Sequence, residues 1–148
     1  MVSIQTGSRA FFGDIPGFKP HDTDMVYICE RGEMRGFLHK RFMKNAAGDG
    51  CDFFIIRDTK ENLMQWELKH AQPMSLGHYL LPDFCREFGI TMADIETLRP
   101  LRDRLDVMHQ YVGLIYDAYM QNGSMTLTDE QRMAAYEEYK RERKNIKQ

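Results

Sequence analysis

The sequence predicts an α+β fold in which a front of short strands is followed by a helical back. The first third is rich in glycine and short apolar runs, whereas from residue 60 onward apolar residues recur every three or four positions with few helix breakers. A chain of 148 residues can bury a core without disulfides or a structural metal. We therefore expect a single domain over 1–148, with a core region at 1–58 and a helical C-terminal region at 59–148 packed on it.

Composition and charge exclude several classes of protein. With 43% hydrophobic and 28% charged residues the chain is neither collagen-like nor disordered, and its net charge of -2 gives no general attraction to nucleic acid or anionic membranes. The longest aliphatic or aromatic run, Phe53–Ile56, is too short to span a membrane, so no membrane partner is expected. The odd, widely spaced cysteines Cys29, Cys51 and Cys85 argue against a disulfide framework or a zinc site and favour a reducing cytoplasm.

The front region predicts three strands, at Val2–Ile4, Asp24–Cys29 and Cys51–Arg57. Gly7-Ser8 ends the first strand, and a helix can begin at the following residues 9–12. Residues 13–21 hold two glycines and two prolines and are expected to form a loop. Residues 30–46 are predicted to be helical and to stop at the glycines of 48–50.

The back predicts a series of helices. The first begins at Lys60, and the next covers 76–88 with Pro82 as an interruption. Thr91 and Asp94 form a capping-type pair that opens a short helix, and a long helix is expected from about Pro100 to Gln121, ended by Asn122-Gly123. The last helix starts at Thr128, with Gln131 as its capping partner, and is expected to bury Met133, Tyr136 and Tyr139.

An apolar stripe runs along the predicted helices between Leu98 and Tyr119. Its members alternate at spacings of three and four, which suits either a core-facing helix or a dimerising coiled coil. In a domain this small we favour the core. A homodimer, or a partner subunit bound through the C-terminal helices, stays open.

Two carboxylates stand at the start of the second predicted strand. The period of two places Asp22 and Asp24 on one face of the sheet, about 7 Å apart, where they repel unless a hard cation such as Mg²⁺ lies between them. Upstream, Gly7-Ser8 lies between strand and helix, where bare backbone can approach an anion. A third acid, Asp52, opens the next strand and could meet the other two.

A Gly-Ser pair, a loop of about a dozen residues, an Asp-x-Asp opening a strand and a third Asp on a neighbouring strand resemble the nucleotidyltransferase superfamily with the DNA polymerase β-like fold, nearest its minimal bacterial members. The resemblance covers about residues 2–56. It implies a small mixed β-sheet flanked by helices, and transfer of a nucleoside monophosphate from a nucleoside triphosphate to a hydroxyl acceptor by a two-metal mechanism.

The resemblance also implies roles for individual residues. Gly7 and Ser8 would contact the triphosphate, and Asp22 and Asp24 would bind two Mg²⁺ or Mn²⁺ ions. Asp52 would bind the metal nearer the acceptor and help to remove its proton. Arg9 is available as a basic residue near the turn. The acceptor, whether protein, RNA or a small molecule, is not readable.

Three alternatives stay open. The third acid could be Asp58 or Glu67 in place of Asp52. The fold could serve as a non-catalytic binding or structural module, which the lack of a third carboxylate near Asp22 and Asp24 would favour. Finally, Arg104 and His109 resemble the Arg-x4-His ribonuclease motif of HEPN domains, although a spacing of five places them about 140° apart on a helix.

Overall fold

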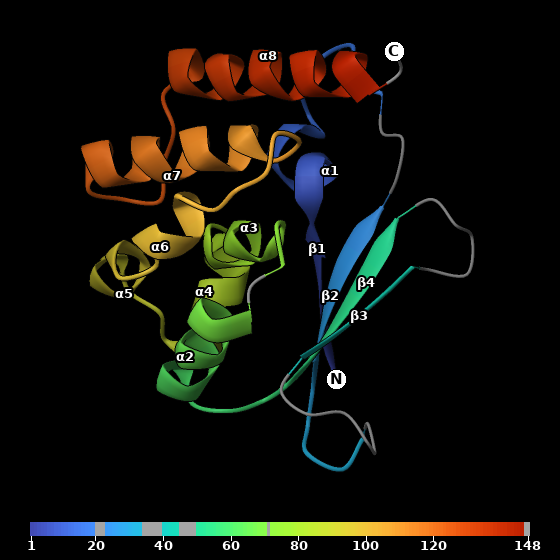
Figure 1. Ribbon diagram of the computed structural model, residues 1–148, viewed down its shortest axis with the longest axis vertical. Coiled ribbons are helices and arrows are strands. Elements are labelled where there is room, and N and C mark those ends of the chain that lie inside the picture. Colours follow the sequence, from blue (N-terminus) through green and yellow to red (C-terminus); the bar gives the residue numbers. More distant parts are fainter. Residues whose placement is uncertain (20–22, 34–39, 45–49, 71, 147–148) are drawn as a thin grey trace. The chain divides into compact units, whose positions relative to one another are not determined.

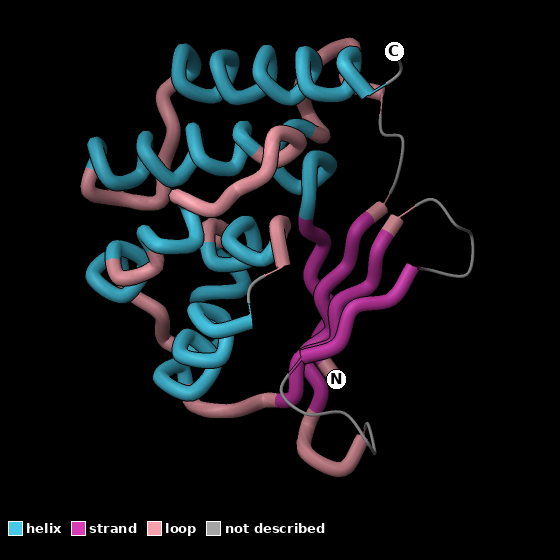
Figure 2. Tube along the Cα trace, viewed as in Figure 1, coloured by secondary structure: helices cyan, strands magenta, loops and turns pink. Residues whose placement is uncertain are grey.

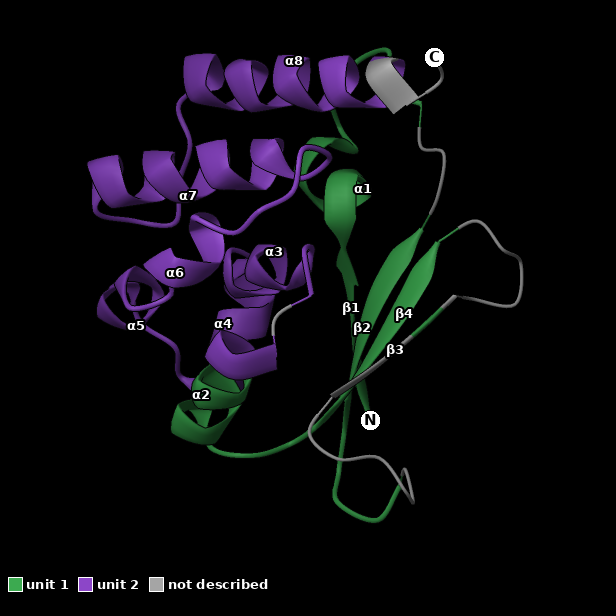
Figure 3. Ribbon diagram, in the orientation of Figure 1, with its two compact units in different colours: residues 1–66 green, residues 67–148 purple. Residues whose placement is uncertain are grey.

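The computed structural model describes residues 1–19, 23–33, 40–44, 50–70 and 72–146 and confirms an α+β fold. The chain divides into two compact units, Met1–Trp66 and Glu67–Gln148 (Figure 3). The elements in chain order are β1 (Val2–Thr6), α1 (Gly7–Phe12), β2 (Asp24–Cys29), β3 (Lys40–Lys44), β4 (Cys51–Ile56), α2 (Lys60–His70), α3 (Ser75–Tyr79), α4 (Pro82–Phe88), α5 (Met92–Glu96), α6 (Arg99–Arg102), α7 (Gln110–Asn122) and α8 (Asp129–Ile146) (Figure 1).

The first unit is built on a mixed four-stranded sheet in the order β1-β2-β4-β3 (Figure 2). β1 pairs antiparallel with β2, β2 parallel with β4, and β4 antiparallel with β3. Side chains alternate across the sheet, so Val26 and its partner Phe53 are buried on one face. Tyr27 and its partner Phe54 stack on the other face, with ring centroids 5.1 Å apart.

The strand β3 lies where the sequence predicted a helix, and that prediction over 30–46 is wrong for Lys40–Lys44. Lys40–Lys44 pairs with Cys51–Ile55 of β4, with Phe42 opposite Phe53. An edge of β4 with open N–H and C=O groups gains a full ladder of hydrogen bonds from such a neighbour. Helical spacing of apolar residues carries no information about that ladder. Residues 34–39 and 45–46 of the predicted helix lie outside the described residues.

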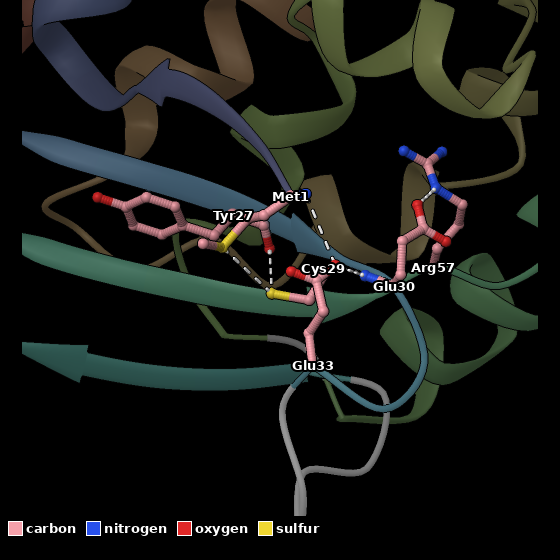
Figure 4. A network of polar contacts seen from close by, with 6 residues as sticks. All are labelled: Met1, Tyr27, Cys29, Glu30, Glu33 and Arg57. Carbon is pink, nitrogen blue, oxygen red and sulfur yellow. Dashed lines mark hydrogen bonds and ion pairs between the residues drawn. The ribbon is translucent and has the colours of Figure 1, made fainter.

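Polar contacts tie the far end of β2 to its neighbours (Figure 4). Arg57, just after β4, donates its backbone N–H to Cys29 O, and its Nε lies 2.7 Å from the carboxylate of Glu30. The terminal ammonium of Met1 lies 3.6 Å from Glu33. These contacts lie at one end of β2, and Asp24, at the opposite end, belongs to the candidate site.

Helix α1 follows β1 without an intervening loop. It has only six residues, and its Phe11 and Phe12 are buried. These rings join the apolar face of the sheet and two residues of α2 in the core of the first unit, whose largest members are Ile4, Phe11, Phe12, Val26, Ile28, Phe53, Ile55, Leu63 and Met64.

The second unit is helical, and several predicted boundaries are confirmed. Thr91 and Asp94 form a reciprocal capping box at α5, and Thr128 and Gln131 exchange the same pair of hydrogen bonds at α8. Gly123 ends α7 in the left-handed conformation, and Pro82 separates α3 from α4. The predicted core stripe is largely buried in the second unit, as the exposures of Leu98, Leu101, Val112, Ile115 and Tyr119 show.

Two predictions in this unit are wrong. The expected long helix from Pro100 is two helices, because α6 ends at Arg102 and α7 begins at Gln110. Between them the Asp106 carboxylate accepts the backbone N–H of Met108 and pairs with His109, a local arrangement that competes with continued helix. Met133, expected in the core, is 43% exposed. No helix in the described part of the chain is long and apolar enough to cross a membrane.

Candidate functional site

The candidate site is centred on Asp24, where three segments of the first unit meet. In the antiparallel pairing of β1 with β2, Thr6 lies opposite Asp24, so the next residue, Gly7, runs alongside the Asp24 side chain. From the other side, the backbone N–H of Cys51 donates to Asp24 Oδ1 over 2.8 Å. Asp24 is only 5% exposed. The start of β4 and the turn after β1 therefore fix its carboxylate between them.

Gly7 is a glycine by necessity. Its φ of 76° lies in the left-handed region, and a Cβ built on it would be 2.4 Å from Asp24 Oδ2. The absence of a side chain lets the backbone of the strand-to-helix turn approach the carboxylate directly. The predicted pairing of the Gly-Ser turn with the acid at the start of the second strand is thus a contact in the structure.

A second glycine brings the third segment close. A Cβ on Gly50 would be 2.1 Å from the backbone oxygen of Thr23, so only glycine lets the chain pass this near the start of β2. The sequence indicated Gly50 merely as part of a helix stop. Its position directly before an apolar strand is the signal that could have marked a close backbone approach.

Ser8 and Arg9 follow Gly7 at the start of α1. Ser8 is 4% exposed. The Nε–H of Arg9 is buried and has no hydrogen-bond partner among the residues that the structure describes. A buried cationic N–H that lacks an acceptor among the described residues is costly, and an anion such as a phosphate oxygen would remove that cost by accepting its hydrogen bond. With only six residues, however, α1 contributes little of the helix-dipole effect expected from the sequence.

Asp52 does not join Asp24. In the parallel ladder Asp52 pairs with Met25, and paired residues point to the same face of a sheet. Asp52 therefore lies on the face of Tyr27 and Phe54, opposite to that of Asp24. The prediction that Asp52 meets Asp24 is wrong, because the register of β4 against β2 is displaced by one residue from the register that would pair them.

The two other candidates for the third acid have different roles. Asp58 lies beyond the opposite end of β4, roughly 20 Å along the strand from the level of Asp24. Its Oδ1 accepts the N–H of Thr59 and the side-chain amide of Asn62, at the start of α2. Glu67 belongs to the second unit, where it is buried and accepts the Tyr79 hydroxyl over 3.3 Å. Burial, together with the Glu67 carboxylate, raises the pKa of Tyr79 well above its ordinary value.

Asp22, the other half of the Asp-x-Asp pair, lies outside the described residues. Among the residues that are described, no three His, Cys, Asp or Glu side chains are grouped to hold a metal ion. Asp24 supplies one carboxylate for a metal ion, and the N–H of Cys51 fixes the orientation of that carboxylate through Oδ1. The structure thus places the Gly7 backbone against Asp24, and Ser8 and Arg9 follow Gly7 in the same turn.

The Arg-x4-His motif is not on a helix. Arg104 and His109 fall in the connection between α6 and α7, and Nδ1 of His109 lies 2.6 Å from Oδ1 of Asp106. Arg104 lines a separate cavity of about 190 Å³ with Leu101 and Leu105. The helical arrangement assumed for a HEPN-like ribonuclease is therefore wrong.

Comparisons with known proteins add no relative. A scan against protein-family models gave no match, and searches among curated proteins and among solved structures gave none either.

Proposed function

We propose that this chain is a metal-dependent nucleotidyltransferase whose site is formed by Gly7, Ser8, Arg9, Asp22 and Asp24. The observation that carries the proposal is the direct contact between the Gly7 backbone and the Asp24 carboxylate. A bare backbone beside a buried carboxylate suits a site that brings a triphosphate close to a metal-binding acid.

Each residue has a distinct task in this proposal. The turn at Gly7 and Ser8 presents backbone and a hydroxyl to the triphosphate, and Arg9 supplies a charge-assisted donor. Asp24, oriented by the N–H of Cys51, holds the metal together with Asp22. Mg²⁺ or Mn²⁺ bound there would neutralise the leaving pyrophosphate and make the acceptor hydroxyl more acidic. Asp52 has no part in this site, because it lies on the other face of the sheet.

The position of Asp52 favours a second candidate function. Without a third carboxylate on the Asp24 face, a base for the acceptor hydroxyl is not identified among the described residues. A module that binds a nucleotide with a metal but transfers nothing would keep the same turn and the same Asp24. The two candidates share the binding step and differ only in the transfer step.

The binding step is tested by calorimetric titration of ATP, CTP, GTP and UTP, each with Mg²⁺ and with Mn²⁺. We expect metal-dependent binding of at least one nucleotide to the wild type. Asp24→Asn should abolish it, because an amide keeps the shape but loses the charge that holds the metal. The matched variant Asp52→Asn, on the opposite face of the same sheet, should bind as the wild type does. Metal-dependent binding to none of the four nucleotides contradicts both candidate functions.

The transfer step is tested with the nucleotide that binds, labelled at its α-phosphate. The protein is incubated with this nucleotide, metal, and pools of proteins, RNA and hydroxylated small molecules. Label that becomes covalently attached in the wild-type reaction and not with Asp24→Asn supports the transferase. Retained binding without any attached label supports the non-catalytic module.

We also propose a cytoplasmic setting, on the strength of the cysteines. In the described structure Cys29, Cys51 and Cys85 form no disulfide, as is usual for proteins of a reducing compartment. Fractionation of the cells that make the protein tests this, and recovery outside the cytoplasm would contradict it.

A further inference from the structure

In the second unit, a carboxylate from α8 occupies the start of α7. Glu142 is 5% exposed, and its Oε1 accepts the backbone N–H of Tyr111 over 3.1 Å. The N-cap residue of α7, His109, makes no capping hydrogen bond with its side chain in the described structure, and the first turn of α7 holds no acid of its own. Glu142 therefore caps α7 from a different helix, 31 residues away along the chain.

The surroundings of the other Glu142 oxygen, Oε2, disfavour a negative charge. Oε2 of Glu142 is buried and has no hydrogen-bond donor among the described residues. On α8 the like charge of Glu138 lies one turn away, and that carboxylate is itself paired with Arg141. An ionised carboxylate with one dry, unpaired oxygen is costly, whereas a protonated one is tolerated.

The remaining groups around this helix start offer limited compensation. Tyr111 and Tyr139 pack edge to face with ring centroids 5.3 Å apart, and Arg143 lies over the Tyr139 ring. His109 is paired with Asp106 in the connection before α7.

We propose that the ionisation of Glu142 controls the contact between α8 and the first turn of α7. The contact stays closed while the Glu142 carboxyl group is protonated, and it opens more often when that group is ionised. On ionisation the proton passes to solvent, and the buried oxygen gains the water it lacks only if the contact opens. The contact responds near neutral pH because the surroundings of Glu142 in the protein, and not the ordinary acidity of a carboxyl group, set the pH at which it ionises.

The direction of the effect follows from the pKa. Burial, with Glu138, raises the pKa of Glu142 from 4.5 to about 7, against the opposing effects of the backbone N–H groups of Tyr111 and Gln110 and the charge of Arg141. Because the pKa of Glu142 is higher in the closed state, its protonated carboxyl group stabilises that state. This contribution is fully present below the ordinary pKa of 4.5 and is lost as the pH rises through about 7. With these two values, linkage gives about a tenfold increase in opening between pH 6 and pH 8.5.

The first test uses the wild type alone. Carbon-13 NMR of the side-chain carboxyl groups follows the ionisation of Glu142 directly. We expect a midpoint near pH 7. A midpoint below about pH 5, the range of ordinary glutamates, overturns the proposal.

The second test measures amide hydrogen exchange at Tyr111, corrected for the intrinsic rate, at pH 6 and pH 8.5. In the wild type, opening should increase about tenfold over this interval. Glu142→Gln keeps an acceptor and cannot ionise, so the increase should vanish. The control Glu137→Gln, an exposed acid on the same helix, should behave as the wild type does. The same pH dependence in Glu142→Gln as in the wild type would overturn the proposal.

Discussion

At the scale of single residues, the candidate site depends on a glycine at position 7. Gly7 has no Cβ, and this alone allows the turn after β1 to lie against the carboxylate of Asp24. The same residue also needs a left-handed backbone, so two separate requirements act on one position. They can be separated experimentally, because another glycine of the first unit has only the second requirement.

We predict that Gly7→Ala destabilises the protein more than Gly17→Ala does. Both glycines have positive φ, 76° and 85°, but a Cβ on Gly17 would meet nothing within 4 Å. The left-handed strain costs about 1–2 kcal/mol in each variant, and Gly7→Ala adds the collision with Asp24. Denaturant unfolding measures both variants. Equal losses would show that Asp24 yields easily and that the contact does not hold the turn.

At the scale of elements, helix starts in the second unit are set by short-range chemistry. In the capping box of α5, Thr91 Oγ1 accepts the Asp94 N–H over 3.3 Å, and the Asp94 carboxylate accepts the Thr91 N–H over 2.9 Å. These bonds join residues three apart, so they form wherever the sequence carries the pair. This is why the helix starts at Thr91 and Thr128 could be predicted from the sequence.

We predict that Thr91→Ala lowers the free energy of unfolding by about 1 kcal/mol, since it leaves an N–H at the start of α5 without its acceptor. Thr91→Ser, which keeps the hydroxyl, should lose much less. Urea unfolding of the two variants makes the comparison. A loss in Thr91→Ser as large as that in Thr91→Ala would assign the effect to the methyl group and not to the cap.

The strand β3 shows the opposite behaviour at the same scale. Lys40–Lys44 is a strand because β4 offers it an edge, with Arg41 opposite Phe54 and Met43 opposite Asp52. The partner residues are ten or so positions away and the pairing is decided by the whole sheet. No local rule indicated it, and the helical spacing of the apolar residues in 30–46 was misleading.

At the scale of the whole molecule, buried phenols make the fold sensitive to alkali. Tyr79, Tyr116 and Tyr119 are buried in the second unit, and their hydroxyls donate to Glu67, to the carbonyl oxygen of Glu96 and to that of Leu80. Burial raises the pKa of all three, that of Tyr119 to about 12. The neutral phenols therefore stabilise the fold, and that contribution decreases as the pH rises from 10 toward 12.

We predict that Tyr79, Tyr116 and Tyr119 ionise only above pH 10, as the second unit unfolds. Phenolate absorbance follows the ionisation and circular dichroism detects the unfolding. In concentrated guanidinium chloride all should titrate together near pH 10. A single phase near pH 10 in the native protein would contradict the burial of these side chains.

The sequence by itself determined what depends on neighbours along the chain. The α+β class, the strands at 24–29 and 51–56, the capped helix starts, and the glycine ends of helices all rest on interactions within a few residues. It also indicated Gly7 and Asp24 as parts of one site.

Only the tertiary structure decided what depends on register. Gly7 touches Asp24 because Thr6 pairs with Asp24, and Asp52 turns away because it pairs with Met25. A shift of one residue in the ladder would reverse the face of every side chain on β4, and nothing in the sequence of one strand fixes its alignment with another. The burial of Glu142 at the start of α7 likewise joins residues far apart in the chain. Pairing between residues far apart in the sequence therefore decides which of the predicted site residues lie together, as Gly7 and Asp24 do, and which, like Asp52, only match the sequence motif.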